Sequence, residues 1–229
     1  MKKNLLVFIL AVIIGVGAGV LMLGGTGSHG DSGGEFRAGE HYFILDKPLS
    51  VSKDTLVAIS SYACPFCYNY HANVMPSIMD KISVRYEPFH MHAMGEYGVS
   101  ASKILAVAKA LDDKASVAPN SPNSKYKKIL EAYFDAYHNK KERWANGADE
   151  AKFLQMGFEA GEITAEIYEN ELKSEAVDKI LTLWDEGYEI AKTSGVPAFV
   201  VGSKYLINIE KIGSAEEFAD LINFLSNKQ

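Results

Sequence analysis

Runs of apolar residues predict three strands between residues 41 and 87. Residues 41–45 and 56–60 form two apolar runs, separated by a turn around Pro48. The second run has no polar alternation, which is typical of a strand buried on both faces. In residues 82–87, Ile, Val and Tyr alternate with Ser, Arg and Glu. That period of two predicts a third strand.

A helix is expected between the second and third of these strands. Pro65 suits its first turn, where the missing backbone N–H would lack a partner anyway. Tyr70 and Val74 continue an apolar face to about Asp80. Pro76 should kink or restart this helix, because proline removes a backbone donor.

From about Gly98 the apolar period becomes helical, and we assign residues 98–192 to an all-helical block with loops at 119–123 and 146–147. The positions that carry the period are Ile104, Ala108, Leu111, Ile129, Tyr133, Ala136, Ile163, Ile167, Val177, Ile180, Trp184, Tyr188 and Ala191. The aromatic residues expected in its core are Tyr133, Phe134, Tyr137, Trp144 and Trp184.

Strand signals return after the helical block. Residues 198–201 and 205–209 are apolar and flank a Gly-Ser turn at 202–203, which predicts a β-hairpin. Residues 214–217 read Ser-Ala-Glu-Glu, a capping box that opens a last helix. The residues that this helix should bury are Phe218, Leu221, Ile222 and Leu225.

The first residues are typical of an export signal. Lys2 and Lys3 precede residues 5–23, a stretch without charge that is longer than a usual signal-peptide core. This length favours an uncleaved membrane anchor. Cleavage stays open as an alternative, because small residues follow at Gly24, Thr26 and Gly27. The two lysines should remain in the cytoplasm, so the rest of the chain is expected beyond the membrane.

Amino-acid composition and net charge limit the possible classes of fold and function. Of the 229 residues, 48% are hydrophobic, which suffices for a folded core. The net charge of −6 disfavours binding to nucleic acid. Residues 24–40 are rich in Gly, Ser and charge and are expected to form a flexible tether.

The chain has two cysteines, Cys64 and Cys67, directly after the apolar run 56–60. A Cys-x-x-Cys pair at a strand-to-helix junction has its first sulfur at the helix N-terminus, where backbone N–H groups stabilise a thiolate. A structural disulfide normally closes a longer loop, and a zinc site would need further ligands at finger spacing. The pair is therefore interpreted as a redox dithiol, with Cys64 the acidic, accessible thiol and Cys67 the protected one.

The order of strands, dithiol, helical block, hairpin and helix resembles the DsbA family of the thioredoxin superfamily. The motifs that carry the resemblance are Cys64-Pro65-Phe66-Cys67, Met94-Gly95, and Gly195-Val196-Pro197-Ala198-Phe199-Val200. It implies an α/β, thioredoxin-like fold with an inserted all-helical domain, preceded by the membrane anchor or signal. The segments are then 1–23 (anchor or signal), 24–40 (tether), 41–97 (thioredoxin-like, first part), 98–192 (helical insertion) and 193–229 (thioredoxin-like, second part).

The resemblance also implies a function. Cys64 would be the nucleophile of an exported thiol:disulfide oxidoreductase and Cys67 its buried partner, without a metal or other cofactor. Pro65, Phe66 and Val196 would support the site, with Pro197 cis beside the dithiol. Substrates would be reduced exported proteins, and a quinone-linked membrane partner would reoxidise the enzyme. We expect a monomer on the periplasmic side of the bacterial inner membrane, or free in the periplasm if the signal is cleaved.

Two positions depart from the family pattern. Phe66 stands where the best-known oxidases carry histidine, and Ala58 where a buried acid is expected. Proton transfer to Cys67 must then use water, Glu87 or Arg85, although both charged residues are expected on the surface.

Other functions remain open at this point. A reductase or isomerase would share the fold. A copper carrier could use the soft ligands His90, Met91, His92 and Met94 with the cysteines, although the histidines also fit a strand end that borders the active site. A peptide-holding protein is the other alternative outside the enzymes.

Overall fold

The computed structural model describes residues 36–144 and 149–228, and five strands form one mixed sheet in it. The strands are β1 (Tyr42–Ile44), β2 (Thr55–Ser60), β3 (Arg85–His90), β4 (Ala198–Val201) and β5 (Tyr205–Ile207). Their order across the sheet is β1-β5-β4-β2-β3. Strand β2 is parallel to β3, and the other neighbours are antiparallel. The pairing of β2 with β4 joins the two parts of the chain that flank the helical block.

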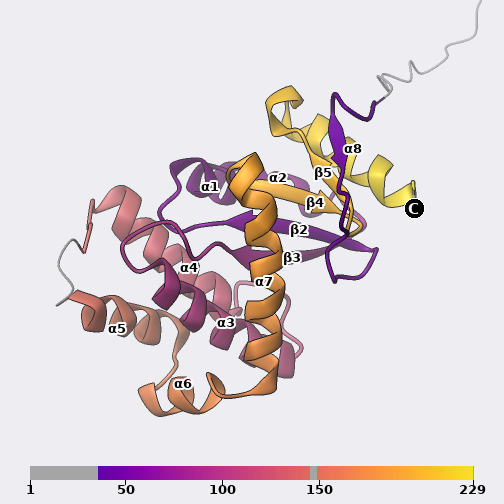
Figure 1. The fold of residues 1–229 in the computed structure, drawn as a ribbon. Coiled ribbons are helices and arrows are strands. Elements are labelled where there is room, and N and C mark those ends of the chain that lie inside the picture. The colour runs from indigo at the N-terminus through magenta and orange to yellow at the C-terminus, as the bar shows by residue number, and fades with distance from the viewer. Residues whose placement is uncertain (1–35, 145–148, 229) are drawn as a thin grey trace, which may run out of the picture. The chain divides into compact units, whose positions relative to one another are not determined.

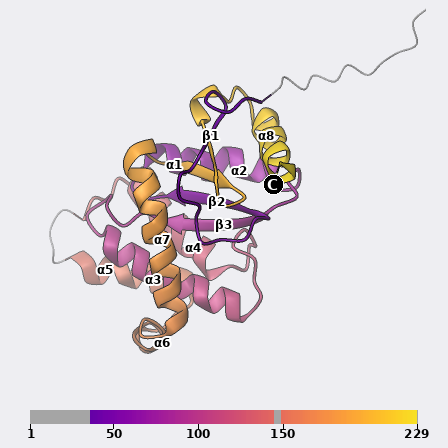
Figure 2. The ribbon, with the colours of Figure 1, turned by 45° about the vertical axis from the view of Figure 1, so that its right-hand side comes forward.

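Helices lie on both sides of the sheet. They are α1 (Pro65–Asn69), α2 (Met75–Ile78), α3 (Gly98–Lys114), α4 (Lys125–Phe134), α5 (Glu150–Gly161), α6 (Ala165–Glu171), α7 (Glu175–Ser194) and α8 (Ala215–Asn227), with π-helical turns η1 (Tyr70–Val74) and η2 (Asp135–Asn139) and a 3-10 turn η4 (Ile209–Lys211). Figures 1 and 2 show α7 across one face, with α3 to α6 on the same side, and α1, α2 and α8 on the other side. The predicted all-helical block beginning at Gly98 is confirmed.

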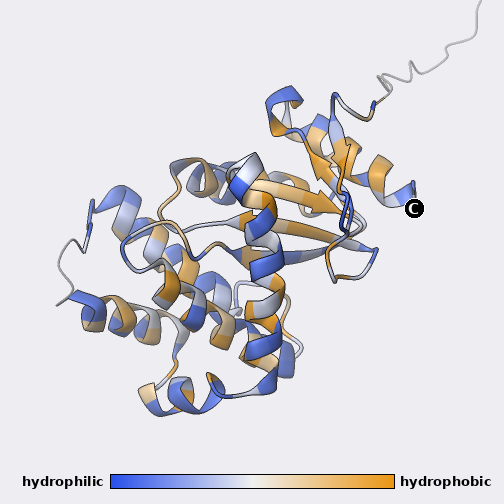
Figure 3. Ribbon diagram, in the orientation of Figure 1, coloured by the Kyte–Doolittle hydropathy of each residue, from blue (hydrophilic) through white to orange (hydrophobic). Residues whose placement is uncertain are grey.

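Strand β2 supplies side chains to two hydrophobic cores. Val57 and Ile59 belong to the core that includes α3, α4 and α7, while Leu56 and Ala58 belong to the core that includes α2 and α8. All four are buried, so the prediction of a strand covered on both faces is confirmed. In Figure 3, β4 and β5 are mostly hydrophobic, whereas α6, which buries none of its residues, is mostly hydrophilic.

Helix α7 packs against β2, β3 and β4, and its Gly187 lies close to β3. A Cβ atom there would lie 2.6 Å from Cδ2 of Phe89 in β3. The absence of a side chain therefore lets helix and strand approach. Helix α7 runs to Ser194 and covers the sheet, so it connects the predicted helical insertion to the sheet. The end of that insertion at residue 192 stays a prediction.

Strand boundaries differ from the prediction, by one residue at β1 and β2 and by more at β3 and β5. The third strand begins at Arg85 instead of residue 82 and continues to His90, because its register follows β2 from Thr55↔Arg85 to Ser60↔His90. The hairpin is confirmed, with Gly202 and Ser203 at positive φ in its turn. Its second strand ends earlier than residue 209, because η4 begins there.

The helix after β2 is interrupted as predicted. It begins as α1, passes through η1, and restarts as α2 with Pro76 in its first turn. The π-helical turn itself carries no signal in the apolar period. π-helical turns are rare in proteins, but those that occur are often found at functional sites.

The predicted capping box of the last helix is confirmed, except that the carboxylate of Glu217 bonds to the N–H of the residue before Ser214. The Oγ atom of Ser214 accepts from the N–H of Glu217 at 3.1 Å, while the Glu217 carboxylate accepts from the N–H of Gly213 at 2.7 Å. The four predicted residues of α8 are buried. In the helical block, Tyr133, Phe134, Trp144 and Trp184 are buried as predicted, and Tyr137 is half-buried.

The predictions for the N-terminal segment mostly fall outside the described residues. These are the anchor or signal at 1–23 and most of the tether; the predicted loop at 146–147 in the helical block also lies outside the described residues. The end of the tether, however, belongs to the folded part: Phe36 packs against Phe224 at 5.6 Å between ring centroids, and the Glu40 carbonyl accepts from Asn208 at 2.8 Å. Within 36–144 and 149–228, no helix is both long and apolar enough to cross a membrane.

Candidate active site

The dithiol lies at the junction between β2 and α1. Cys64 is the N-cap of α1, and its sulfur accepts a hydrogen bond from the N–H of Cys67 at 3.2 Å. Pro65 follows in the first turn, where its missing N–H costs nothing. Both cysteines are free thiols. The predicted strand-to-helix placement is confirmed.

The two thiols differ in acidity. Hydrogen bonds from the Cys67 thiol and from the N–H groups of Cys67 and Phe66 outweigh burial and lower the pKa of Cys64 to about 7. Burial raises the pKa of Cys67, and the neighbouring Cys64 sulfur raises it further. One sulfur is therefore stabilised as thiolate and the other as thiol, in the predicted order.

Exposure does not separate the two sulfurs. Cys64 is 3% exposed and Cys67 is 2% exposed, so the expectation of an accessible Cys64 is wrong for this reduced form. A chain segment distant in sequence lies against the sulfur: the Val196 carbonyl is 3.4 Å from Cys64 Sγ. Acidity, and not exposure, distinguishes Cys64.

The proline motif meets the dithiol as predicted. The peptide bond between Val196 and Pro197 is cis, and Pro197 lines a small cavity together with Cys67. The carbonyl of Val196 accepts from the Cys64 thiol. Pairing of β4 with β2 is what brings these two segments together.

Tyr62, two residues before Cys64, is held by two histidines. Its N–H donates to Nε2 of His90 at 3.3 Å, and its carbonyl lies 2.9 Å from Nε2 of His138. The other ring nitrogen of His90 is 2.7 Å from Oγ of Ser102. Burial lowers the pKa of His90 to about 3, so the ring is neutral near pH 7. The sequence placed His90 at a strand end bordering the active site but did not predict its hydrogen bond to Tyr62, and it gave no sign of His138.

The Met94-Gly95 motif packs beside the same turn. Gly95 has φ +86°, and a Cβ atom there would lie 2.9 Å from the Cβ of Ala63 and closer still to the Tyr62 hydroxyl. That hydroxyl accepts from the N–H of Tyr97 at 3.1 Å. Only glycine fits both this conformation and this contact.

Phe66 is the exposed member of the dithiol motif, at 68% exposure. Its ring projects an uncharged apolar surface next to Cys64.

The charged residues considered for proton transfer lie elsewhere than predicted. Glu87 is half-buried, because its carboxylate pairs with Nζ of buried Lys109 at 2.9 Å, so its surface placement is wrong. Burial opposes the charge on Lys109, but Glu87 and Asp113 raise the pKa of that ammonium group. Arg85 is exposed as expected and donates to Thr55. Neither lines the cavity beside Cys67.

The soft-ligand cluster is not assembled. Both ring nitrogens of His90 are engaged by Tyr62 and Ser102, and His92 faces Asp185 with 3.5 Å between Nδ1 and Oδ1. In residues 36–144 and 149–228, no group of three or more His, Cys, Asp or Glu side chains is arranged to hold a metal ion.

Comparison with known proteins agrees with this geometry. No family model matches the sequence. The thiol:disulfide interchange protein DsbL of Escherichia coli O6:H1 is 42% identical over 195 residues, which cover 84% of this chain and 88% of that protein. The thiol:disulfide interchange protein DsbA of Dickeya dadantii is 26% identical over 211 residues, with 86% and 92% covered.

A solved structure extends the likeness to the fold. The crystal structure of DsbL from Salmonella enterica serovar Typhimurium has a TM-score of 0.80 and 40% identity, covering 85% of this chain and 98% of that chain. The mixed sheet with its helices is thus the thioredoxin fold as DsbA and DsbL proteins have it. The chain belongs to the DsbA family of thiol:disulfide oxidoreductases.

Proposed function

We propose that the protein is a disulfide oxidase for exported proteins, with Cys64 as the reacting sulfur and Cys67 as its buried partner. The observation that carries the proposal is the unequal acidity of the two thiols at the start of α1. A stabilised Cys64 thiolate lowers the free energy of the reduced enzyme, and this makes the oxidised enzyme a stronger oxidant.

The reaction is a two-step exchange. A substrate thiolate attacks Sγ of Cys64, the bond between Cys64 and Cys67 breaks, and Cys67 leaves as a thiolate that takes up a proton. A second substrate thiolate then attacks the substrate sulfur of the mixed disulfide, and Cys64 leaves as a thiolate. The substrate loses two electrons and the enzyme gains them. The low pKa of Cys64 favours its departure in the second step.

Substrate binding is proposed at the surface next to Cys64. The Val196 backbone would pair with an extended substrate segment as one more strand, and the exposed ring of Phe66 would contact apolar substrate side chains. Pro65, in the first turn of α1, and Pro197, which lines the cavity beside Cys67, would support this site.

The location and partners are also part of the proposal. Residues 1–23 have the composition of an anchor or signal, which supports a periplasmic enzyme at the bacterial inner membrane and reoxidation by a quinone-linked membrane partner. Expression of the full chain followed by alkaline washing of membranes tests the anchor. We expect the protein in the membrane pellet. A shortened protein in the wash would show that residues 1–23 are a cleaved signal and not an anchor.

The cysteine roles are tested by trapping. In Cys67→Ser, the Cys64 thiolate should attack a disulfide-containing peptide, release one peptide sulfur as a thiol and accumulate a mixed disulfide, and Cys64→Ser should form none, as read by mass spectrometry. In the wild-type reduced protein, the rate of alkylation by iodoacetamide should inflect near pH 7, the pKa of Cys64. Preferential labelling of Cys67 would overturn the assignment.

Redox equilibrium with glutathione decides the direction of the reaction. We expect the reduced form of the enzyme to dominate at ratios of reduced to oxidised glutathione at which a reductase would be oxidised, because the Cys64 thiolate is stabilised. A dithiol that strongly prefers the disulfide would instead make the protein a reductase. Metal analysis of the purified protein separates both from a copper carrier.

A further inference from the structure

Cys67 has to exchange a proton in every catalytic cycle, yet it lies away from solvent. It is 2% exposed, and burial holds its pKa above the ordinary value. The position where the family pattern has an acid is Ala58, which cannot carry a proton. Glu87 is held by Lys109 at 2.9 Å. Another group must connect Cys67 with solvent.

A small cavity lies against Cys67. Its volume is about 20 Å³, and its lining includes the side chains of Cys67, His71, Tyr86 and Pro197. One water molecule needs roughly 10–15 Å³ and at least two polar partners. The cavity can therefore hold one water between the thiol and the neighbouring polar side chains.

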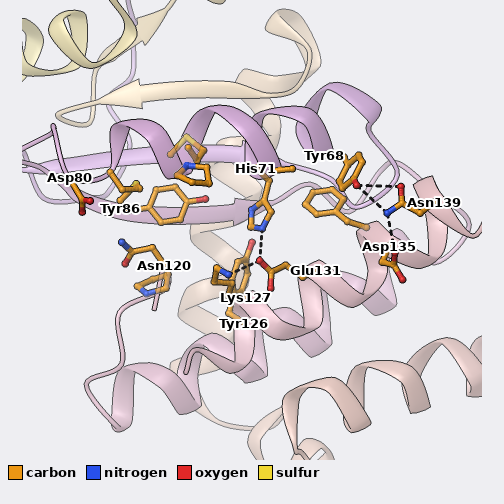
Figure 4. A pocket seen from close by; sticks show the side chains of 16 residues that line it. Tyr68, His71, Asp80, Tyr86, Asn120, Tyr126, Lys127, Glu131, Asp135 and Asn139 are labelled. Atoms are coloured by element: carbon orange, nitrogen blue, oxygen red, sulfur yellow. Dashed lines mark hydrogen bonds and ion pairs between the residues drawn. The ribbon is translucent and has the colours of Figure 1, made fainter. Parts of the chain in front are cut away.

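A larger pocket of about 540 Å³ adjoins this cavity and is drawn in Figure 4. Four residues line both hollows: His71, Met75, Tyr86 and Phe134. In Figure 4, the His71 ring reaches from η1 toward Glu131 on α4, and Tyr86 points into the same part of the pocket. His71 and Tyr86 thus form the partition between the larger pocket and the cavity beside Cys67.

Tyr126, which also lines the larger pocket, has a buried polar atom. The hydroxyl of Tyr126 is buried and has no hydrogen-bond partner among the described residues. A buried hydroxyl left unsatisfied costs about 1–3 kcal/mol, which a bound water removes. This lining favours a hydrated pocket.

The contacts of His71 prepare it to accept a proton. Its Nε2 lies 3.3 Å from Oε1 of Glu131, whose carboxylate also pairs with Lys127. An ionised carboxylate only accepts hydrogen bonds, so Nε2 carries the hydrogen and Nδ1 is the basic atom. The carboxylate would also stabilise the imidazolium that forms when Nδ1 takes up a proton.

We propose that His71 is the proton-exchange group of Cys67, working through the cavity that both side chains line; the proposal rests on the role of Cys67 given above. When a mixed disulfide is resolved, the Cys67 thiol gives its proton to Nδ1, directly or through one water. The Cys67 thiolate attacks Cys64 Sγ, the bond to the substrate sulfur breaks, and the substrate leaves as a thiolate. During substrate oxidation the imidazolium returns the proton to the departing Cys67.

The sign of the pH dependence follows from the surroundings of His71. The titratable and charged groups that face it are Glu131 and Lys127 on α4 and Tyr86 on β3. Burial lowers the pKa of His71 and outweighs the opposing effect of Glu131. The ring is therefore a free base near pH 7, and resolution by Cys67 should slow in acid as that base becomes protonated.

The test separates the two chemical steps. The reduced full-length protein is mixed with oxidised glutathione, and rapid quenching with mass spectrometry follows formation of the Cys64 mixed disulfide and its resolution by Cys67. In His71→Gln, resolution at pH 7 should slow by about 10²-fold, the order of magnitude of general base catalysis, and its acid inflection should disappear. Formation, which depends on Cys64, should stay within about twofold of the wild type, because the proposal assigns His71 no part in that step.

Two further variants control for structure. His92→Gln removes a histidine that follows β3 outside this cavity, and its resolution rate should equal the wild-type rate. In His71→Ala, added imidazole should restore resolution, because the open pocket admits it. Unchanged resolution in His71→Gln, or equal slowing of both steps without rescue, would overturn the proton role while the exchange function stands. Failure of Cys67→Ser to trap a mixed disulfide would overturn the exchange function itself.

Discussion

Cys64 and Cys67 show how strongly the immediate surroundings of a thiol decide its chemistry. Both are almost completely buried, so desolvation disfavours a thiolate at each. Only Cys64 stands at the N-cap, where the N–H of Cys67 points at its sulfur. At Cys67, one turn later, burial and the Cys64 sulfur outweigh the backbone hydrogen bonds that lower its pKa. Although the two cysteines are only three residues apart, the protein therefore favours the thiolate at Cys64 and the thiol at Cys67.

Phe66 supplies a prediction at the same scale. Because its ring is 68% exposed, Phe66→Ser should change the free energy of unfolding by no more than about 0.5 kcal/mol. Oxidation of a reduced peptide with apolar residues beside its cysteine should slow several-fold. Stopped-flow oxidation and urea melts measure the two effects. A peptide that carries only polar neighbours is the control, and equal slowing of both peptides would contradict an apolar contact.

At the scale of elements, the end of β3 fixes the turn before the dithiol. His90 has no charge near pH 7 and uses both ring nitrogens, one for the Tyr62 N–H and one for Ser102. We expect His90→Gln to cost about 1–3 kcal/mol, the range for a buried hydrogen-bond partner that is lost. Urea melts at pH 7 measure this cost.

The same substitution has a defined pH dependence. Burial depresses the pKa of His90 from 6.5 to about 3 in the folded protein, so its contribution to stability is complete above pH 6.5 and is lost as the pH falls toward 3. The stability difference between wild type and His90→Gln should therefore shrink by about 1–2 kcal/mol between pH 7 and pH 5. A constant difference over that range would show that the folded protein does not depress the pKa of His90.

The contact between α7 and the sheet gives the second prediction for an element. Gly187→Ala places a Cβ atom 2.6 Å from the Phe89 ring, and overpacking of this kind costs about 1–3 kcal/mol. Glu189→Ala, two residues away on the exposed side of the same helix, is the matched control and should stay within about 0.5 kcal/mol. If the two variants unfold at the same urea concentration, α7 does not depend on this close approach.

For the whole molecule, the redox state should couple to stability through Cys64. Its pKa is lowered from 9.0 to about 7 in the folded reduced protein. A depressed pKa contributes stability that is complete above the unfolded value and is lost as the pH falls through the folded value. The oxidised form has no thiolate, so the reduced form should gain about 1 kcal/mol relative to the oxidised form between pH 6 and pH 8.

Thermal or urea melts of both redox forms across this pH range check the prediction. Histidines titrate in both forms, so their effects cancel in the difference. Cys64→Ser, compared with the oxidised wild type, should lose the pH-dependent gain. A reduced form that gains nothing between pH 6 and pH 8 would mean that the folded protein does not stabilise the Cys64 thiolate.

The local features of this protein follow from its sequence. A buried strand, a helix N-terminus and the two cysteines between them are neighbours along the chain, so hydrophobic period and spacing predict the dithiol and the order of its two pKa values. The hairpin, the capping box and the helical block beginning at Gly98 are likewise local patterns. The cis peptide at Pro197 is implied by the family resemblance of its motif.

Contacts between distant segments are decided only by the tertiary structure. The Cys64 sulfur contacts the carbonyl of Val196, 132 residues away, and Glu87 pairs with Lys109 in α3. The cavity between Cys67 and His71 is closed by residues of β2, β3, α4 and β4. The hydrophobic period of a helix or strand predicts which of its faces is buried. It does not predict which polar side chains from other elements contact that face, because those contacts depend on how the sheet and the helical block pack together.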